Sequence, residues 1–137
     1  MSWEHFSHDA DVGIRGRGAT MAEAFAEAGR ALTAVVTDPS GVRADTTVEI
    51  HAQADDPEML LFDWLNALVY ETATRDLLFS RFDVRIDGDR LEAKAVGEAV
   101  DVARHHPAVE VKGATWTGLR VARDEDGTWV AQCVVDV

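Results

Sequence analysis

Two segments of the chain place apolar residues at helical spacing. The first is expected to begin after Thr20, which stands three residues before Glu23 as in a capping box. Its apolar stripe consists of Phe25, Ala28, Leu32 and Val35. The turn residues at positions 38–41, which include a proline and a glycine, end the pattern. The sequence therefore predicts a helix with one apolar face that ends before residue 38.

A second helix is expected after Asp56. Its carboxylate can cap the helix, and Pro57 is favoured at the first helical position. One face of this helix carries Leu61, Trp64, Leu65, Leu68 and Val69. We expect the helix to end between Thr74 and Asp76, where the apolar pattern stops.

Other segments alternate apolar and polar residues, as half-buried strands do. The alternating apolar positions are Val48, Ile50 and Ala52, then Phe82, Val84 and Ile86, then Leu91, Ala93 and Ala95, and lastly Leu119 and Val121. Tight turns are expected at 87–89 and 124–127, the second before a final strand over residues 128–137. The order β-α-β-α-β-β-β-β predicts an α+β two-layer sandwich, with both helices on one face of a mixed, largely antiparallel sheet.

The length and composition indicate a single domain over residues 1–137, with enough apolar residues for a packed core. The chain has 13 basic and 25 acidic residues, for a net charge of −12. Because such a surface repels a phosphate backbone, no direct and stable binding of nucleic acid is expected. Proteins, metals and small molecules are the partners that this charge favours.

Cys133 is the only cysteine, which excludes an internal disulfide and a cysteine-based zinc cluster. It lies in the apolar run 130–135 and is predicted to be a buried thiol. No apolar stretch approaches the ~20 residues that cross a bilayer, and the N-terminus lacks the residue order of a secretion signal. We therefore expect a cytoplasmic location and no membrane association.

Three patterns resemble catalytic or ligand motifs but lack their context. Ser7-His8 has no glycine-flanked nucleophile elbow, so it does not indicate a hydrolytic triad. The segment 13–18 lacks the strand, turn and helix of a phosphate loop, and its glycines are expected to shape a strand. His105-His106 lies in the weakly patterned segment 99–109 and has the wrong spacing for two metal ligands on one helix face. We interpret that segment as an exposed loop of the kind that often serves function.

The two ends of the chain carry a candidate metal site. Asp9 and Asp11 would point to the same side of an extended segment, with His8 on the other side. Asp136 and the terminal carboxylate of Val137 add two anionic groups, and hard cations prefer such oxygen ligands. If the ends meet, these groups predict a divalent cation site. If they do not, the acidic residues lie on the solvated face of a strand.

The same residues belong to a series of motifs that spans the chain. These motifs are HDADVG at 8–13, AEAF at 22–25, LLFDWLNALVY at 60–70, a GE…D…RH…P…EVKGATW stretch over 97–116, and VVDV at 134–137. In this order they resemble the archease family. The chain departs from the family pattern at Asp9, where threonine is usual, at Gly113, where alanine is usual, and at Trp116-Thr117, where Tyr-His is usual.

The resemblance implies an accessory protein of the RtcB-type RNA ligase, the GTP- and metal-dependent enzyme of tRNA splicing and RNA repair. Such a protein promotes guanylylation of the ligase and its multiple turnover, and it is not itself an enzyme. The resemblance assigns a divalent cation, calcium by its oxygen ligands, to Asp11, Asp136 and Val137. Asp9 is a candidate additional ligand. The resemblance also assigns the ligase-activating role to Lys112.

The loop around Arg104 and His105 is a candidate partner contact, because an acidic protein with such a loop could dock on a basic ligase. Two other functions stay open. The acidic site could activate water in a metal-dependent hydrolase of phosphoesters or nucleotides, with His8 or Asp9 as general base. The chain could also be a chaperone-like binding module.

Overall fold

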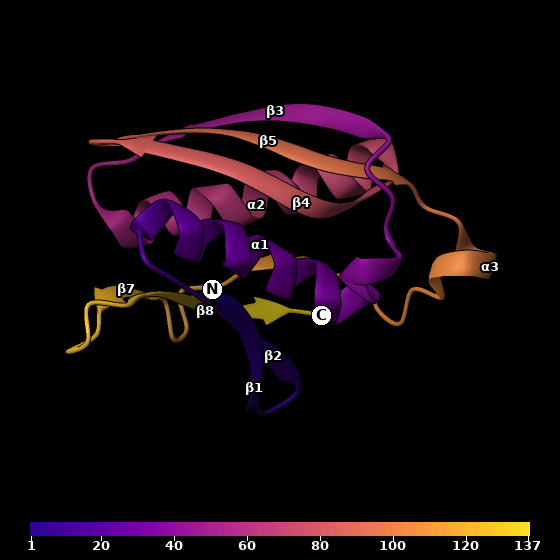
Figure 1. Ribbon diagram of the computed structural model, residues 1–137. Helices are drawn as coiled ribbons and strands as arrows, with labels where there is room; N and C mark the ends of the chain where they lie inside the picture. The colour runs from indigo at the N-terminus through magenta and orange to yellow at the C-terminus, as the bar shows by residue number, and fades with distance from the viewer.

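The two long helices form where the sequence predicts them. In the computed structural model, which describes residues 1–137, α1 spans Met21–Val36 and α2 spans Pro57–Arg75 (Figure 1). The Thr20 hydroxyl accepts a hydrogen bond from the Glu23 backbone nitrogen at 3.1 Å, and the Asp56 carboxylate accepts one in the first turn of α2 at 2.9 Å. Both predicted caps are therefore confirmed.

Strands and two short helical segments make up the rest of the secondary structure. The strands are β1 (Ser2–His8), β2 (Asp11–Gly18), β3 (Thr46–Gln53), β4 (Leu77–Asp87), β5 (Arg90–Ala99), β6 (Gly113–Ala114), β7 (Arg120–Arg123) and β8 (Trp129–Asp136). The short helical segments are η1 (Pro39–Gly41) and α3 (Val102–His105). Every pair of neighbouring strands is antiparallel.

The strands form two sheets rather than one. A five-stranded sheet has the order β1-β2-β8-β6, with β7 also pairing with β8, and a three-stranded sheet has the order β3-β5-β4. Both helices lie between the sheets and contact strands of each (Figure 1). The α+β class and the largely antiparallel pairing are confirmed, but no parallel pair is present, so the sheets are not mixed. The prediction of a single sheet with both helices on one face is wrong.

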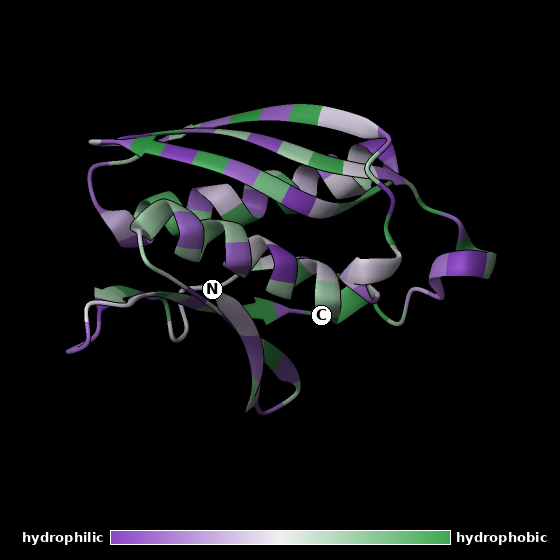
Figure 2. Cartoon of the chain, viewed as in Figure 1, coloured by the Kyte–Doolittle hydropathy of each residue, from purple (hydrophilic) through white to green (hydrophobic).

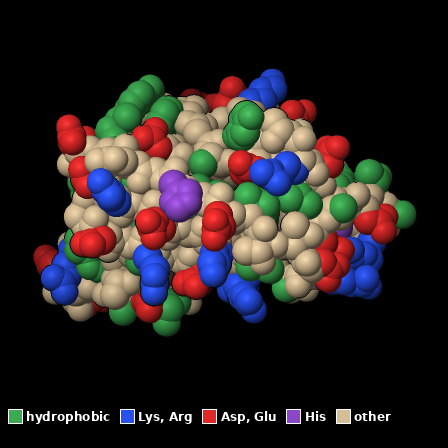
Figure 3. Space-filling model, turned by 90° about the horizontal axis from the view of Figure 1, so that it is seen from above, with side chains coloured by type: hydrophobic (Ala, Val, Ile, Leu, Met, Phe, Trp, Pro, Cys, Tyr) green, Lys and Arg blue, Asp and Glu red, His purple; other side chains and the backbone are tan.

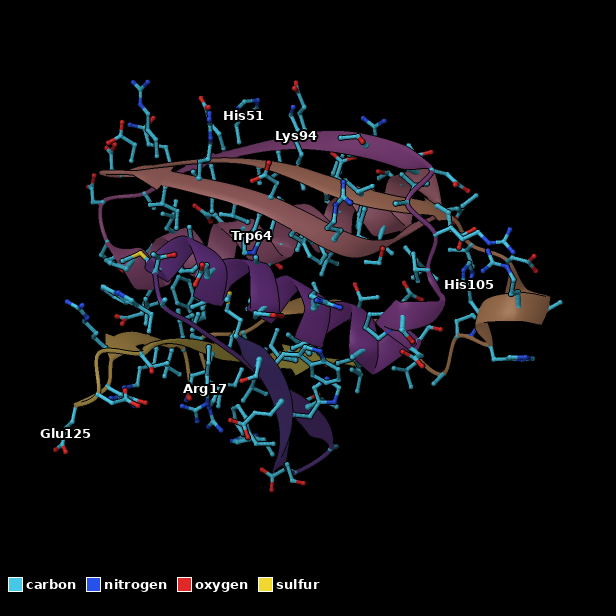
Figure 4. The ribbon with its side chains drawn as sticks, in the orientation of Figure 1. Arg17, His51, Trp64, Lys94, His105 and Glu125 are labelled. Atoms are coloured by element: carbon cyan, nitrogen blue, oxygen red, sulfur yellow. The ribbon has the colours of Figure 1, made fainter.

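The helices occupy the middle layer because they are apolar on more than the single stripe that the pattern indicated. In α1, the small residues Ala24 and Ala31 are fully buried beside the predicted stripe. In α2, the fully buried indole of Trp64 donates a hydrogen bond to the Phe25 carbonyl oxygen of α1 at 2.9 Å, and Figure 4 shows this side chain between the two sheets. A helix that is buried on two sides can support a sheet on each of them.

Two further local predictions need correction. The N-terminal segment forms a hairpin of two strands, β1 and β2, rather than one extended strand, because residues 9 and 10 make a turn. The segment 99–109, predicted as an exposed loop, contains α3. The Asp101 carboxylate caps this helix by accepting from the backbone nitrogen of Ala103 at 3.1 Å, and a helix of four residues is too short to show an apolar period.

The glycine-rich segment of β2 has the structural role that the sequence predicts. A Cβ atom on Gly16 would lie 2.3 Å from the Ala24 oxygen and 2.3 Å from the Ala28 nitrogen, both in the backbone of α1. Glycine therefore lets α1 lie directly on β2. Figure 2 shows the complementary pattern in the three-stranded sheet, where hydrophobic and hydrophilic residues alternate along the strands. None of the helices combines the length and the apolar character that spanning a membrane requires.

Candidate functional site

The end of β8 lies between the start of β2 and the start of β6. Val12 of β2 pairs with Val135, so the next position in this register sets Asp11 opposite Asp136. On the other side of β8, Gly113 of β6 pairs with Asp136. The two ends of the chain therefore meet, as the candidate metal site requires, and residues opposite one another in such a pair leave the same face of the sheet.

The carboxylates at this sheet end have no positive partner within the protein. Asp11 is half-buried, Asp136 is exposed and Val137 is half-buried. None of them belongs to any of the salt bridges in the structure. Neighbouring unpaired carboxylates repel one another, and a bound cation would remove that repulsion.

Side chains alone do not complete a metal site here. No group of three or more His, Cys, Asp or Glu side chains is arranged to hold a metal ion. Asp11 and Asp136 contribute two carboxylates, so the predicted ligand set depends on the main-chain carboxylate of Val137.

Lys112 directly precedes the short strand at this end. Its backbone nitrogen donates a hydrogen bond to the Asp136 carbonyl oxygen at 2.8 Å, and its side chain is exposed and in no salt bridge. The structure therefore gathers the predicted ligase-activating lysine and the predicted metal ligands at one end of one sheet.

A buried ionic cluster lies at the start of the segment that leads to Lys112. The Glu98 carboxylate accepts hydrogen bonds from the Arg104 guanidinium and, at 2.6 Å, from the Arg43 backbone nitrogen. These bonds, the Arg104 bond first, hold the pKa of Glu98 at about 2, below its ordinary value of 4.5. The Nδ1 atom of His105 accepts from the Asp101 backbone nitrogen at 2.9 Å, so its Nε2 carries the proton and donates to Glu98 at 3.0 Å.

The burial of His105 corrects its predicted role. The residue is 5% exposed, so its ring has no surface with which to contact a partner. Its hydrogen bonds instead fix α3 against β5. Arg104 keeps a partly exposed side chain, but its charge is already paired with Glu98. Sequence reasoning missed Glu98 because only the fold brings its carboxylate to this histidine.

Comparison with known proteins bears on the whole chain. A model of the Archease protein family (MTH1598/TM1083) matches residues 3–137. The chain belongs to the archease family.

Archease relatives cover the chain almost end to end. The archease of Pyrococcus abyssi is 37% identical over 139 residues, and the alignment covers 98% of each chain. The archease of Pyrococcus furiosus is 38% identical with the same coverage. The solution structure of protein 1598 from Methanobacterium thermoautotrophicum is 33% identical, covers 99% of each chain and superimposes with a TM-score of 0.86.

A more distant structure has the same fold. The crystal structure of a Thermotoga maritima protein, described as an archease and possible chaperone, is 20% identical and covers 98% of this chain and 96% of its own, with a TM-score of 0.64.

Within this archease fold, the turn between β1 and β2 changes the prediction for Asp9. This residue is exposed and has a φ of +50°, so it is not part of an extended strand. The expectation that Asp9 and Asp11 share one strand face is therefore wrong. His8 pairs directly with Asp11 across the hairpin and leaves the sheet on the same face, contrary to the expectation that it points away. The sequence signal for the turn was Asp9 itself, because aspartate adopts a positive φ more readily than most residues.

Trp116, which stands where the archease family usually has tyrosine, packs on α2. Its ring stacks on Phe62 with ring centres 4.4 Å apart, yet Trp116 remains 63% exposed. Thr117, at the position of the usual histidine, lies in the turn between β6 and β7, and its carbonyl oxygen accepts a hydrogen bond from the Val134 nitrogen of β8 at 3.0 Å.

Two other surfaces of the protein are less suited to binding an ion. A cavity of about 330 Å³ between the ends of α1 and α2 is lined mainly by apolar side chains, including Leu68 and Phe79. The outer face of the three-stranded sheet mixes acidic and basic side chains (Figure 3). There Lys94 pairs in register with Glu49 and Asp83, and Figure 4 shows its side chain pointing away from the helices. Such alternation gives no concentrated charge for an ion.

Proposed function

We propose that the protein is a non-catalytic accessory protein of an RtcB-type RNA ligase in tRNA splicing and RNA repair. It promotes guanylylation of the ligase and its multiple turnover, acts in the cytoplasm and works with a bound divalent cation. The observation that carries this proposal is the meeting of β2, β8 and β6 at one sheet end. This meeting brings Asp11, Asp136, Val137 and Lys112 together.

The donor set fits a hard cation, calcium in this proposal. Asp11, Asp136 and the terminal carboxylate of Val137 are all anionic oxygen donors without a competing positive partner, and Ca²⁺ accepts such ligands in flexible geometry. The cation would tie the ends of β2 and β8 together and neutralise part of their charge. Lys112 would then stand beside a neutralised site as an exposed positive group.

Charge supports the choice of a protein partner. A net charge of −12 favours docking on the basic surface of an enzyme that itself binds RNA. Arg104 lies on the same segment as Lys112 and keeps part of its side chain at the surface. We therefore include Arg104, without the buried ring of His105, in the surface that meets the ligase.

The test is a multiple-turnover RNA ligation assay with purified ligase, GTP and metal. Lys112→Ala and Asp11→Asn are each expected to lower ligase turnover at least tenfold. Lys94→Ala is the matched control, because it removes the only other lysine, on the outer face of the opposite sheet, and should leave turnover unchanged. Full activation by both the Lys112 and the Asp11 variant would overturn the proposal.

A metal-dependent hydrolase is the second candidate, favoured by the pairing of His8 with Asp11. In that function His8 would act as general base beside the cation. Hydrolysis of a phosphomonoester by the purified protein with manganese, lost in His8→Ala, would support it.

A chaperone-like binding module is the third candidate, favoured by the apolar cavity and by the exposure of Trp116 and Tyr70. Suppression of aggregation of unrelated proteins would support that function.

A further inference from the structure

The strand that follows Lys112 is short, and backbone hydrogen bonds of Lys112, Thr115 and Thr117 extend its pairing with β8. β6 consists of Gly113 and Ala114 alone and lies at the edge of the five-stranded sheet, where β8 is its only neighbouring strand. A strand pair of two residues has little cooperativity of its own. Whatever fixes this segment therefore also fixes the backbone of Lys112.

α2 supplies that fixation from outside the sheet. The Ala114 backbone nitrogen donates a hydrogen bond to the Oδ1 atom of Asn66 at 3.0 Å. A Cβ atom on Gly113 would lie only 3.3 Å from the same oxygen, so the amide packs directly on the strand. Because a backbone N–H can pair only with the oxygen of the amide, this bond also defines which way the Asn66 side chain is turned.

Asn66 is one of three α2 residues, spaced four apart, that contact the segment after Lys112. Glu58 accepts a hydrogen bond from the Val121 backbone nitrogen at 3.0 Å, and Phe62 stacks on Trp116. Residues at this spacing lie along one side of a helix. The segment therefore runs antiparallel to α2, and Asn66 makes the contact nearest to Lys112.

We infer that Asn66 is a positioning residue for Lys112, which holds the ligase-activating lysine at a fixed place relative to Asp136 and Val137. This inference rests on the proposed role of Lys112. Asn66 acts through one hydrogen bond to Ala114, two residues beyond the lysine, and the Lys112–Asp136 backbone bond carries this fixation to the end of β8. Asn66 is the only asparagine in the chain, so no other side chain of this type could replace it.

Three variants separate positioning from general stability. Asn66→Leu keeps the side-chain size but removes the acceptor, whereas Asn66→Asp keeps an acceptor at the same place. Glu58→Leu is the matched control, because it removes the same kind of bond from the same helix to β7, further from Lys112. The readouts are backbone amide exchange, measured by NMR without any ligase, and ligase turnover.

In Asn66→Leu, the amides of Lys112 and Ala114 are expected to exchange about tenfold faster, as the loss of one hydrogen bond implies. Ligase turnover at saturating accessory protein should fall about tenfold, since small displacements of a working group are costly. Asn66→Asp should restore both quantities. Glu58→Leu should lower thermal stability to a similar extent and change neither the Lys112 exchange nor the turnover.

Unchanged exchange at Lys112 in Asn66→Leu would overturn the inference, as would equal losses of turnover in Asn66→Leu and Glu58→Leu. Because the exchange measurement needs no ligase, its outcome is separate from that of the proposed function. If Lys112→Ala activates the ligase fully while Asn66→Leu still loosens Lys112, the proposed function fails and the structural link from Asn66 to Lys112 stands.

Discussion

The Nε2 atom of His105 donates a hydrogen bond to the Glu98 carboxylate at 3.0 Å, and the bond lies inside the protein. It joins α3 to β5 and so anchors the segment that runs on to Lys112. The Glu98 carboxylate also accepts from Arg104 and from the backbone of Arg43, so its negative form is stabilised by three donors.

The pH dependence of stability should reflect this carboxylate. The pKa of Glu98 is about 2 in the folded protein against an ordinary value of 4.5, so its contribution to stability is fully present above pH 4.5 and is lost as the pH falls toward 2. Glu98→Gln should therefore lower the melting temperature at pH 7, and its difference from the wild type should shrink as the pH falls from 4.5 toward 2. Thermal melts at several pH values measure this.

Glu71→Gln is the control for this experiment. Glu71 pairs with Arg75 one helical turn away, and the Arg75 side chain is 58% exposed. Exposed pairs of this kind contribute little. The melting temperature of Glu71→Gln should therefore differ little from that of the wild type, and by the same amount at every pH. An equally steep pH dependence in both variants would contradict the special role of Glu98.

The affinity for calcium should depend on the free carboxylate of Val137. Amidation of this group removes one of the three proposed anionic ligands, so the dissociation constant should rise by about tenfold or more. Asp136→Asn should have a similar effect. Isothermal titration calorimetry with CaCl₂ measures both, and an affinity unaffected by amidation would remove Val137 from the ligand set.

Trp64 should carry a large share of the stability of the middle layer. The residue is fully buried, bonds to the Phe25 carbonyl oxygen and meets the Phe82 ring edge to face at 5.8 Å. Trp64→Ala should lower the free energy of unfolding by about 3–5 kcal/mol. Tyr70→Ala, on the same helix but 64% exposed, should cost about 1 kcal/mol or less. Urea denaturation compares the two.

Gly16 should not tolerate a side chain. Because a Cβ atom there would meet two backbone atoms of α1 at 2.3 Å, Gly16→Ala must push α1 away from β2. A loss of about 1–3 kcal/mol or more is expected. At Gly41 an added Cβ meets no atom within 4 Å, so Gly41→Ala should be neutral or slightly stabilising. Equal thermal stability of the two variants would refute the close helix–strand contact.

The features that the sequence predicted well are local ones. The first residues of α1 and α2 follow from Thr20, Asp56 and their neighbours, because each N-cap forms its hydrogen bond within four residues. The division into two sheets could not be read in the same way, because strand pairing joins distant segments. The buried alanines of α1 and Leu60 of α2, which lie outside the predicted stripes, were signs of this division, but neither shows which strands pair.

The candidate site was predictable in part. The meeting of Asp11 with Asp136 follows from one register between distant strands, which motif order suggested but spacing could not establish. The misplacement of Asp9 came from treating a turn as a strand. The burial of His105 depends on Glu98, seven residues earlier in β5, whose carboxylate looks like any exposed acid in the sequence.

The central position of β8 also has a consequence for biosynthesis. β2 ends at Gly18, but its partner β8 begins only at Trp129. At about 5–20 residues per second, a nascent chain exposes the inner edge of β2 for roughly 6–22 seconds before β8 is synthesised. During that interval α1, α2 and the β3-β5-β4 sheet can already assemble, while the edge of β2 that later binds β8 stays unpaired. The charged Arg15 and Arg17 along that hairpin would discourage pairing with other nascent chains until β8 arrives.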